Sequence, residues 1–308
     1  MINVEDLTKR YGGKTAVDAL SFTARPGQVT GFLGPNGAGK TTTLRMLLGL
    51  EAPTGGTATV DGVPFRTRPR GLRHVGALLD ATQVHGGRTA AAQLSALARS
   101  NAIPPGRVDE VLREVGLTEA ANRRIRGFSL GMKQRLGIAA ALLGDPPVLM
   151  FDEPVNGMDP EGVLWARRLF RRLAAEGRTV FLSSHLMSEM ENTADHLVVI
   201  GRGRLLAAEP VRAFADRAAH PRRTVVVGTP RATELTAVLT AAGASVEPDG
   251  RPGAGQLTVT GLPAERIGAL ALDHRIPLTQ LTPRTASLEA AFMQLTADSV
   301  EYLAGHSR

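Results

Sequence analysis

The chain has 308 residues, of which 43% are hydrophobic, so it can bury a substantial core as one large or two smaller domains. It contains no cysteine, which excludes disulfides and thiolate metal sites and is compatible with the cytoplasm. The formal net charge is +7, but the arginines are scattered along the chain, so we expect a solvated basic surface and no nucleic-acid partner.

No segment is predicted to be a targeting signal or a membrane span. Residues 1–6 already carry charged side chains, unlike a signal peptide. The longest apolar run, residues 136–143, is much shorter than the roughly 20 residues that cross a bilayer. We therefore expect the chain to have no membrane span of its own.

Short apolar runs alternate with amphipathic helical runs over the first two thirds of the chain. This pattern is typical of an α/β domain with a mainly parallel sheet. The strand signal disappears between residues 90 and 145 and helical runs take over, which predicts a helical insertion over about 85–145. The buried strands are predicted over residues 29–33, 74–79, 148–151, 179–182 and 197–200.

The character of the sequence changes near residue 210, where Glu209-Pro210 ends the α/β pattern. Strands are predicted after it at 224–228, 244–247, 256–260 and 276–282, and helices at 231–242 and 263–272. This βαββαβ-like order predicts a small α+β domain over residues 211–308, with a ferredoxin-like arrangement as one option. A final helix is predicted around residues 288–295 from the spacing of its apolar side chains.

Residues 34–41, GPNGAGKT, match the pattern G-x-x-x-x-G-K-[ST] between a predicted strand and a predicted helix. Glycines let successive backbone N–H groups turn inward around phosphate oxygens, and the helix N-terminus adds its positive dipole end. Lys40 is expected to reach the β- and γ-phosphates and Thr41 to ligate Mg²⁺. The context disfavours the alternative of a glycine-rich turn with an exposed lysine. The predicted nucleotide-binding residues of this loop are Gly34, Asn36, Gly37, Ala38, Gly39, Lys40, Thr41 and Thr42.

Two adjacent carboxylates follow the predicted strand at 148–151. At the end of such a strand Asp152 can hold Mg²⁺, directly or through water, while Glu153 can orient or deprotonate an attacking water. A solvated acidic turn after a core strand is a frequent alternative. The phosphate-binding loop earlier in the chain favours the catalytic interpretation.

Two further residues fit the same site. Tyr11 follows a predicted edge strand and offers a flat face on which adenine can stack, although a surface tyrosine beside Gly12-Gly13 would look the same. His185 follows the strand at 179–182 and is expected near the γ-phosphate. A lone histidine is more often structural, so its assignment depends on the other motifs.

Residues 128–135, FSLGMKQR, hold no carboxylate and no histidine, only Ser129 and Gly131 at the start of a predicted helix. The stretch is either an ordinary helix cap or half of a site whose other half lies elsewhere.

Together these motifs resemble the nucleotide-binding subunits of ABC transporters, over roughly residues 1–210. FSLGM aligns with the LSGGQ signature of that family and keeps Ser129 and Gly131. Residues 156–159, NGMD, match the D-loop and add Asp159 to the nucleotide-binding residues, and His185 matches the switch histidine. The resemblance implies an α/β P-loop NTPase fold of the ABC type, with an N-terminal antiparallel β subdomain and a helical insertion.

The resemblance also implies a mechanism and partners. Two such domains pair head to tail, here as a homodimer, and each ATP lies between the phosphate loop of one and the signature of the other. Ser129 would then contact the γ-phosphate across the interface, through the same anion-binding physics that the phosphate loop uses. The implied cofactors are ATP and Mg²⁺. The implied partner is an integral-membrane permease subunit, which places the chain at the cytoplasmic face of the cell membrane.

One position departs from the family pattern. The family usually has a glutamine after the strand that leads into the helical insertion, and this chain has Asp80 there, with Gln83 three residues on. A carboxylate can also ligate Mg²⁺, so we expect Asp80 to be a metal ligand. The alternative is that Asp80 caps a loop and Gln83 takes the role.

Within the family, the chain is similar to the ATPase subunits of bacterial drug and antibiotic exporters of the daunorubicin-resistance and bacitracin-resistance types. The shared traits are a single nucleotide-binding domain, an extra C-terminal α+β region and the segment SLEAAFMQLT at residues 287–296. We therefore expect an ATPase that powers export of a drug, antibiotic or lipid-like compound. A soluble ABC ATPase acting on nucleic acid or the ribosome is the alternative. The C-terminal region is expected to stabilise the assembly, with ligand-dependent regulation as the other option.

Overall fold

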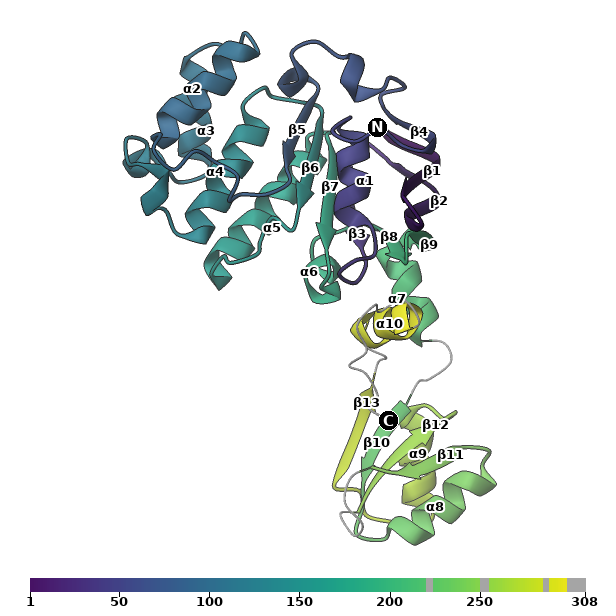
Figure 1. The fold of residues 1–308 in the computed structure, drawn as a ribbon. Coiled ribbons are helices and arrows are strands. Elements are labelled where there is room, and N and C mark those ends of the chain that lie inside the picture. The colour runs from purple at the N-terminus through teal and green to yellow at the C-terminus, as the bar shows by residue number, and fades with distance from the viewer. Residues whose placement is uncertain (220–223, 250–254, 285–287, 298–308) are drawn as a thin grey trace, which may run out of the picture. The chain divides into compact units, whose positions relative to one another are not determined.

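The computed structural model describes residues 1–219, 224–249, 255–284 and 288–297 (Figure 1). The chain divides into two compact units. One comprises Met1–Val211 together with the described residues after 294, and the other comprises Arg212–Gln294.

The first unit is built on a six-stranded sheet with the order β5-β6-β7-β3-β8-β9. All neighbours are parallel except β8 and β9, which pair antiparallel. The bounds are Val75–Leu78 for β5, Val148–Asp152 for β6, Thr179–Ser184 for β7, Val29–Leu33 for β3, His196–Gly201 for β8 and Arg204–Pro210 for β9. Strands β3, β6 and β7 are buried throughout, as their continuous apolar runs predict for a parallel sheet covered on both faces.

A second, antiparallel sheet has the order β2-β1-β4, with bounds Lys14–Ala24, Ile2–Tyr11 and Gly55–Val60. Helix α1, Lys40–Leu47, contacts β2 and β4 of this sheet and β6 of the large one. Phe22, Phe32 and Phe181 meet in the core there, with ring centroids 5.2–5.5 Å apart. The parallel core sheet and the antiparallel N-terminal sheet agree with the predicted fold class.

The chain between β5 and β6 is mainly helical. It contains α2 at Ala90–Ser100, α3 at Gly106–Glu114 and α4 at Leu130–Leu142, which lie side by side (Figure 1). Helix α5, Pro160–Ala175, follows β6, and α6, Met187–Glu191, follows β7. An ion pair between Arg172 of α5 and Glu114 of α3 connects this helical segment to α5, the helix that follows β6. None of the helices in the described part of the chain has the length and apolar composition needed to cross a bilayer.

The second unit contains a four-stranded sheet with the order β11-β12-β10-β13, antiparallel throughout. Its strands are β10 at Thr224–Gly228, β11 at Ser245–Pro248, β12 at Gln256–Thr260 and β13 at Gln280–Arg284. Helices α8, Ala232–Ala241, and α9, Ala264–Asp273, pack on it through a buried cluster that includes Leu235, Val259 and Ile267. The element order is the predicted βαββαβ.

One strand of this unit begins later than predicted. β13 begins at Gln280, whereas the sequence predicts a strand from 276. Ile276 is buried in the cluster beside the end of α9, and the Pro277 carbonyl accepts a hydrogen bond from Thr229 Oγ1 at 2.8 Å. Because both residues make these other contacts, strand pairing begins only after them. The described residues also include the α-helices α7 at Val211–Ala219 and α10 at Leu288–Thr296. Ser287, the first residue of the SLEAAFMQLT segment, lies outside the described residues.

Candidate active site

The loop between β3 and α1 is shaped by close backbone contacts. A Cβ atom on Gly34 would lie 2.6 Å from the Ile200 carbonyl oxygen, and one on Gly39 would lie 2.6 Å from that of Ala16. Gly39 also has a φ of 101°, which side chains rarely tolerate. The loop is therefore held in a tight turn that leads directly into the N-terminus of α1, whose first N–H groups are available to an anion.

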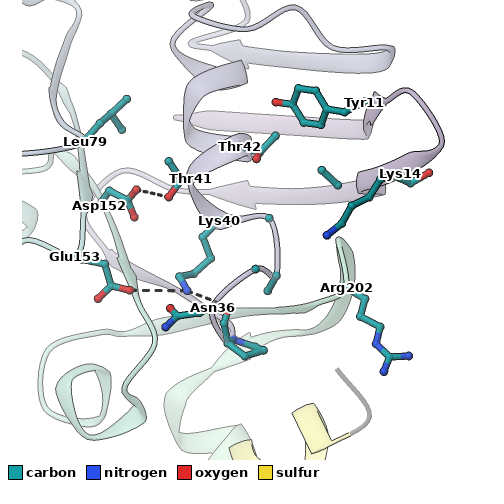
Figure 2. Close-up of a pocket in the computed structure, with 16 residues that line it drawn as sticks. Tyr11, Lys14, Asn36, Lys40, Thr41, Thr42, Leu79, Asp152, Glu153 and Arg202 are labelled. Atoms are coloured by element: carbon teal, nitrogen blue, oxygen red, sulfur yellow. Dashed lines mark hydrogen bonds and ion pairs between the residues drawn. The ribbon is translucent and has the colours of Figure 1, made fainter. Parts of the chain in front are cut away.

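Lys40 is the first residue of α1 and is only 7% exposed. Its Nζ donates to the carbonyl oxygens of Gly34 at 2.6 Å and Pro35 at 3.3 Å, and lies 3.8 Å from Glu153 Oε1 (Figure 2). Burial lowers the pKa of Lys40, and the attraction of Glu153 and Asp152 opposes that change. A largely desolvated cation is thus held at the loop.

The side chains of Thr41 and Asp152 meet at the end of β6. Thr41 Oγ1 donates to Asp152 Oδ2 at 2.6 Å, and Ser183 Oγ donates to Asp152 Oδ1. The hydroxyl and the carboxylate are hard oxygen donors in direct contact, the type of pair on which Mg²⁺ binds together with phosphate oxygens. The donor set therefore fits a magnesium ion bound with a nucleotide.

Glu153 follows β6 with a φ of 49°, a left-handed conformation that costs a non-glycine residue of order 1–3 kcal/mol. Its N–H group faces Ser183, which offers Oγ at 3.1 Å and the carbonyl at 3.3 Å. Both carboxylate oxygens lie 3.0 Å from His185 Nδ1. Burial raises the pKa of Glu153 and outweighs the opposing effects of His185 and Lys40. A carboxylate with a raised pKa is a suitable general base.

Lys40, Thr41, Asp152 and Glu153 line a cavity of about 790 Å³ (Figure 2), whereas His185 contacts Glu153 and does not itself line the cavity. Tyr11 lines it and is 47% exposed. Its hydroxyl donates to Glu51, and this hydrogen bond raises the pKa of Tyr11, while Lys9 Nζ lies 4.9 Å from the centre of the ring. The ring is thus fixed at the cavity edge, where a flat base can stack.

The cavity also has lining residues that the motifs did not predict. They come from β2, the end of β5 and the turn between β8 and β9, and no local pattern in those segments marks them. They are Lys14, Thr15, Ala16, Leu79 and Arg202.

Four predicted nucleotide-binding residues do not line this cavity: Gly34, whose carbonyl oxygen accepts a hydrogen bond from Lys40, and Ser129, Gly131 and Asp159. Ser129 is the N-cap of α4, and its Oγ accepts a hydrogen bond from the Met132 N–H at 3.2 Å. Asp159 is the N-cap of α5, and its Oδ1 accepts from the Gly162 N–H at 2.8 Å. Within one chain Ser129 and Asp159 therefore act as helix caps.

Asp80 caps a loop. Its Oδ1 accepts hydrogen bonds from the N–H of Thr82 at 2.8 Å and from Thr82 Oγ1 at 2.6 Å. These bonds, with a smaller contribution from Gln83, lower the pKa of Asp80. Leu79 lines the cavity and Asp80 does not, so the geometry corresponds to the loop-cap alternative. The metal role of Asp80 stays a prediction.

The first comparisons concern the sequence. Residues 17–156 match the family model described as ABC transporter, and residues 223–289 match a domain of unknown function (DUF8746). Over 213 residues the chain is 45% identical to the bacitracin transport ATP-binding protein BcrA of Bacillus licheniformis, which covers 68% of this chain and 70% of that protein. The chain belongs to the ABC transporter ATP-binding proteins.

Other relatives of this ABC transporter protein are named for export or transport. It is 41% identical to the Nod factor export ATP-binding protein I of Ralstonia nicotianae, over 67% of this chain and 66% of that protein. It is 34% identical to the lantibiotic transport ATP-binding protein SrtF of Streptococcus pyogenes, over 67% of this chain and 89% of that protein.

Solved structures share the fold. The structure of an ATP binding subunit of an ABC transporter matches with a TM-score of 0.65 and 25% identity, over 70% of this chain and 92% of that chain. The dimeric structure of MJ0796, a bacterial ABC transporter cassette, matches with a TM-score of 0.64 and 22% identity, over 69% and 99%. The predicted family, fold class and ATPase activity coupled to transport are confirmed.

Proposed function

We propose that this ABC protein is the ATP-hydrolysing subunit of an exporter, in which two copies bind two ATP molecules between them and a separate membrane subunit carries the cargo. The observation that carries the proposal is the convergence of Lys40, Thr41, Asp152 and Glu153 on one cavity large enough for a nucleotide, with His185 in contact with Glu153. Each of these groups suits one part of a phosphoryl-transfer site.

In this proposal the loop between β3 and α1 binds the phosphates. The N–H groups at the start of α1 and the desolvated ammonium of Lys40 both favour a triphosphate over water. Thr41 and Asp152 would hold Mg²⁺ against the bound phosphates, where the ion neutralises charge that develops during transfer.

In this proposal Glu153 and His185 promote hydrolysis. The carboxylate of Glu153 is poised to take a proton from the attacking water, because its raised pKa improves its basicity. The contact of His185 Nδ1 with both carboxylate oxygens keeps the carboxylate in one orientation. In the bound state His185 would then lie near the γ-phosphate, beside Glu153.

The signature residues act in trans in this proposal. Ser129 and Gly131 lie outside the chain's own cavity, at the start of α4, where free N–H groups can bind a phosphate. A second copy, paired head to tail, would supply that phosphate, and Asp159 would approach the same interface. The solved MJ0796 cassette, which shares the fold, is described as dimeric and supports this arrangement.

The names of the relatives support a proposal for the cargo and for the location. Those reported above are named for bacitracin transport, Nod factor export and lantibiotic transport. We infer export of an antibiotic, drug or lipid-like compound through an integral-membrane permease, with the chain on the cytoplasmic face of the membrane. Residues 211–308 are proposed as an accessory domain of this subunit.

The test uses co-expression with a candidate permease, the membrane protein encoded next to this chain. Vesicles that contain both proteins should accumulate bacitracin in the presence of MgATP. Vesicles with Lys40→Ala, or without the permease, should not. ATP hydrolysis without accumulation of any exporter cargo would reject the export proposal and leave the ATPase activity standing.

A further inference from the structure

The backbone that carries Glu153 is held from helix α4. Gln134 Nε2 donates to the carbonyl oxygens of Glu153 at 3.5 Å and Asn156 at 3.3 Å. Asn156 N–H in turn donates to the Glu153 carbonyl at 3.3 Å, which closes the turn. Gln134 therefore spans both ends of the turn that follows the proposed general base.

Gln134 makes no competing contacts in the described part of the chain. Its side chain is only 7% exposed, and its Oε1 has no hydrogen-bond partner among the described residues. A buried amide whose side-chain hydrogen bonds all go to one turn holds that turn in place, because moving the turn would leave the amide N–H donors unpaired.

A second contact joins the same two segments. A Cβ atom on Gly157 would lie 2.2 Å from Leu130 Cδ2, and Gly157 has a φ of 74°, so only glycine fits there. Leu130 stands where the family signature has glycine. This departure therefore has a structural counterpart, because the Leu130 side chain packs on the turn that begins at Glu153.

Helix α4 thus links two parts of the proposed mechanism, the contact with the second copy and the turn after Glu153. Its first turn carries Ser129, the proposed contact with the second copy's nucleotide, and Gln134 lies five residues later, about 7.5 Å along a rigid helix axis. The turn after Glu153 serves the chain's own nucleotide. A displacement of Ser129 by a phosphate would move Gln134 and Leu130 with it.

We propose that Gln134 and the Leu130–Gly157 contact couple the two nucleotide sites of a pair, by joining the signature end of α4 to the backbone that positions Glu153. This inference rests on the proposed pairing and on the proposed role of Glu153. Gln134 is a positioning residue, since it does not line the nucleotide cavity and acts on Glu153 through the backbone.

The test compares Gln134→Met, which keeps the side-chain length and removes the donor, with Lys133→Met. Lys133 is the neighbouring residue, and in the described part of the chain its side chain makes no hydrogen bond to residues 153–158. In Gln134→Met we expect kcat to fall by about 10- to 100-fold, as for a reacting group displaced by about 1 Å. The ATP Kd should change less than about twofold, and the Hill coefficient for ATP should fall towards 1.

Leu130→Ala provides the second variant and should move kcat and the Hill coefficient in the same direction. Hydrogen exchange in the nucleotide-free chain provides a readout independent of hydrolysis. Amides 154–158 should exchange faster in Gln134→Met than in the wild type or Lys133→Met.

The possible outcomes separate this inference from the proposed function. Unchanged exchange at 154–158 would refute the contact, and faster exchange with wild-type kcat and Hill coefficient would reduce Gln134 to a structural residue, which overturns the proposal. A wild-type chain without ATP hydrolysis would reject the proposed function itself. An active wild type with a normal Gln134→Met variant rejects this inference alone.

Discussion

The replacement Glu153→Gln removes the proposed general base while keeping the shape of its side chain. The amide can still reach His185, but it cannot accept a proton from water. We expect the ATP affinity to persist, because the groups that face the phosphates are Lys40 and the N–H groups of α1. Hydrolysis should nearly stop, and ATP should then favour the closed pair.

The expected loss of rate is large. A positioned general base contributes about 10²- to 10⁴-fold, which corresponds to about 3–5 kcal/mol of activation free energy. The effect should appear in kcat and in kcat/KM alike, because the proton transfer occurs only in the transition state.

The expected change in stability is small, and its sign follows from the pKa values. Lys40 and Glu153 attract each other by about 4 kcal/mol at 3.8 Å if the effective permittivity is about 20. Burial outweighs this attraction, because the pKa of Glu153 is raised and that of Lys40 is lowered. A raised carboxyl pKa contributes stability below the unfolded-state pKa, and this contribution is lost as the pH rises through the folded-state pKa. At neutral pH the neutral amide should therefore leave Tm within about 2–4 °C of the wild type, or raise it.

Phosphate release at saturating MgATP measures the rate, and equilibrium titration with calorimetric melting provides the controls. Wild-type turnover in Glu153→Gln would refute the assignment of the base. A large fall in Tm together with lost ATP binding would instead mean that the charge supports the fold, against the pKa argument.

The remaining predictions concern other parts of the cavity. Lys40→Ala should weaken ATP binding by roughly 10- to 150-fold, the loss expected for charge-assisted hydrogen bonds of about 1.5–3 kcal/mol, and calorimetric titration with an unchanged Kd would reject the phosphate contact. Tyr11→Phe should retain most of the ATP affinity, whereas Tyr11→Ala should lose the stacking of about 1–3 kcal/mol, and equal affinities in both variants would contradict adenine stacking. Asp80→Asn should leave the Mg²⁺ dependence of hydrolysis unchanged if Asp80 caps its loop, and a raised Mg²⁺ requirement would restore it as a ligand. Because its folded-state pKa is lowered, the stability that Asp80 contributes is present above the unfolded-state pKa and is lost as the pH falls through the folded-state pKa, which acid unfolding of the variant measures.

The predictable part of the structure is the part that local sequence dictates. Strands β3, β6 and β7 are continuous apolar runs, so their burial could be read directly from the sequence. The phosphate loop could be predicted because its glycines and the following helix are adjacent in the chain. The edge strand β9 was not predicted, since only one of its seven residues is buried and its pairing with β8 comes from a turn rather than from its own pattern.

The contacts that complete the cavity could not be predicted, because they join segments far apart in the sequence. The Gly34 backbone is confined by the Ile200 carbonyl, and Arg202 reaches the cavity from the turn that follows it. The residue types of Ile200 and Arg202 give no indication of a functional role in the sequence. For Asp80, the sequence allowed both a metal ligand and a loop cap, and its hydrogen bonds from Thr82, which correspond to the loop cap, could not be read from the sequence.

The FSLGMKQR segment illustrates the same difference on a smaller scale. Its serine and glycine predict a phosphate-binding helix start, and that prediction rests on local sequence. Leu130 looks like a loss of function in an alignment with LSGGQ, because a bulky side chain replaces a glycine. In the fold it packs on Gly157, a residue that only its φ and its neighbour explain, and Gln134 binds the same turn. A substitution in the signature thus becomes interpretable only with its partner 27 positions away along the chain, and the two are best tested as a pair.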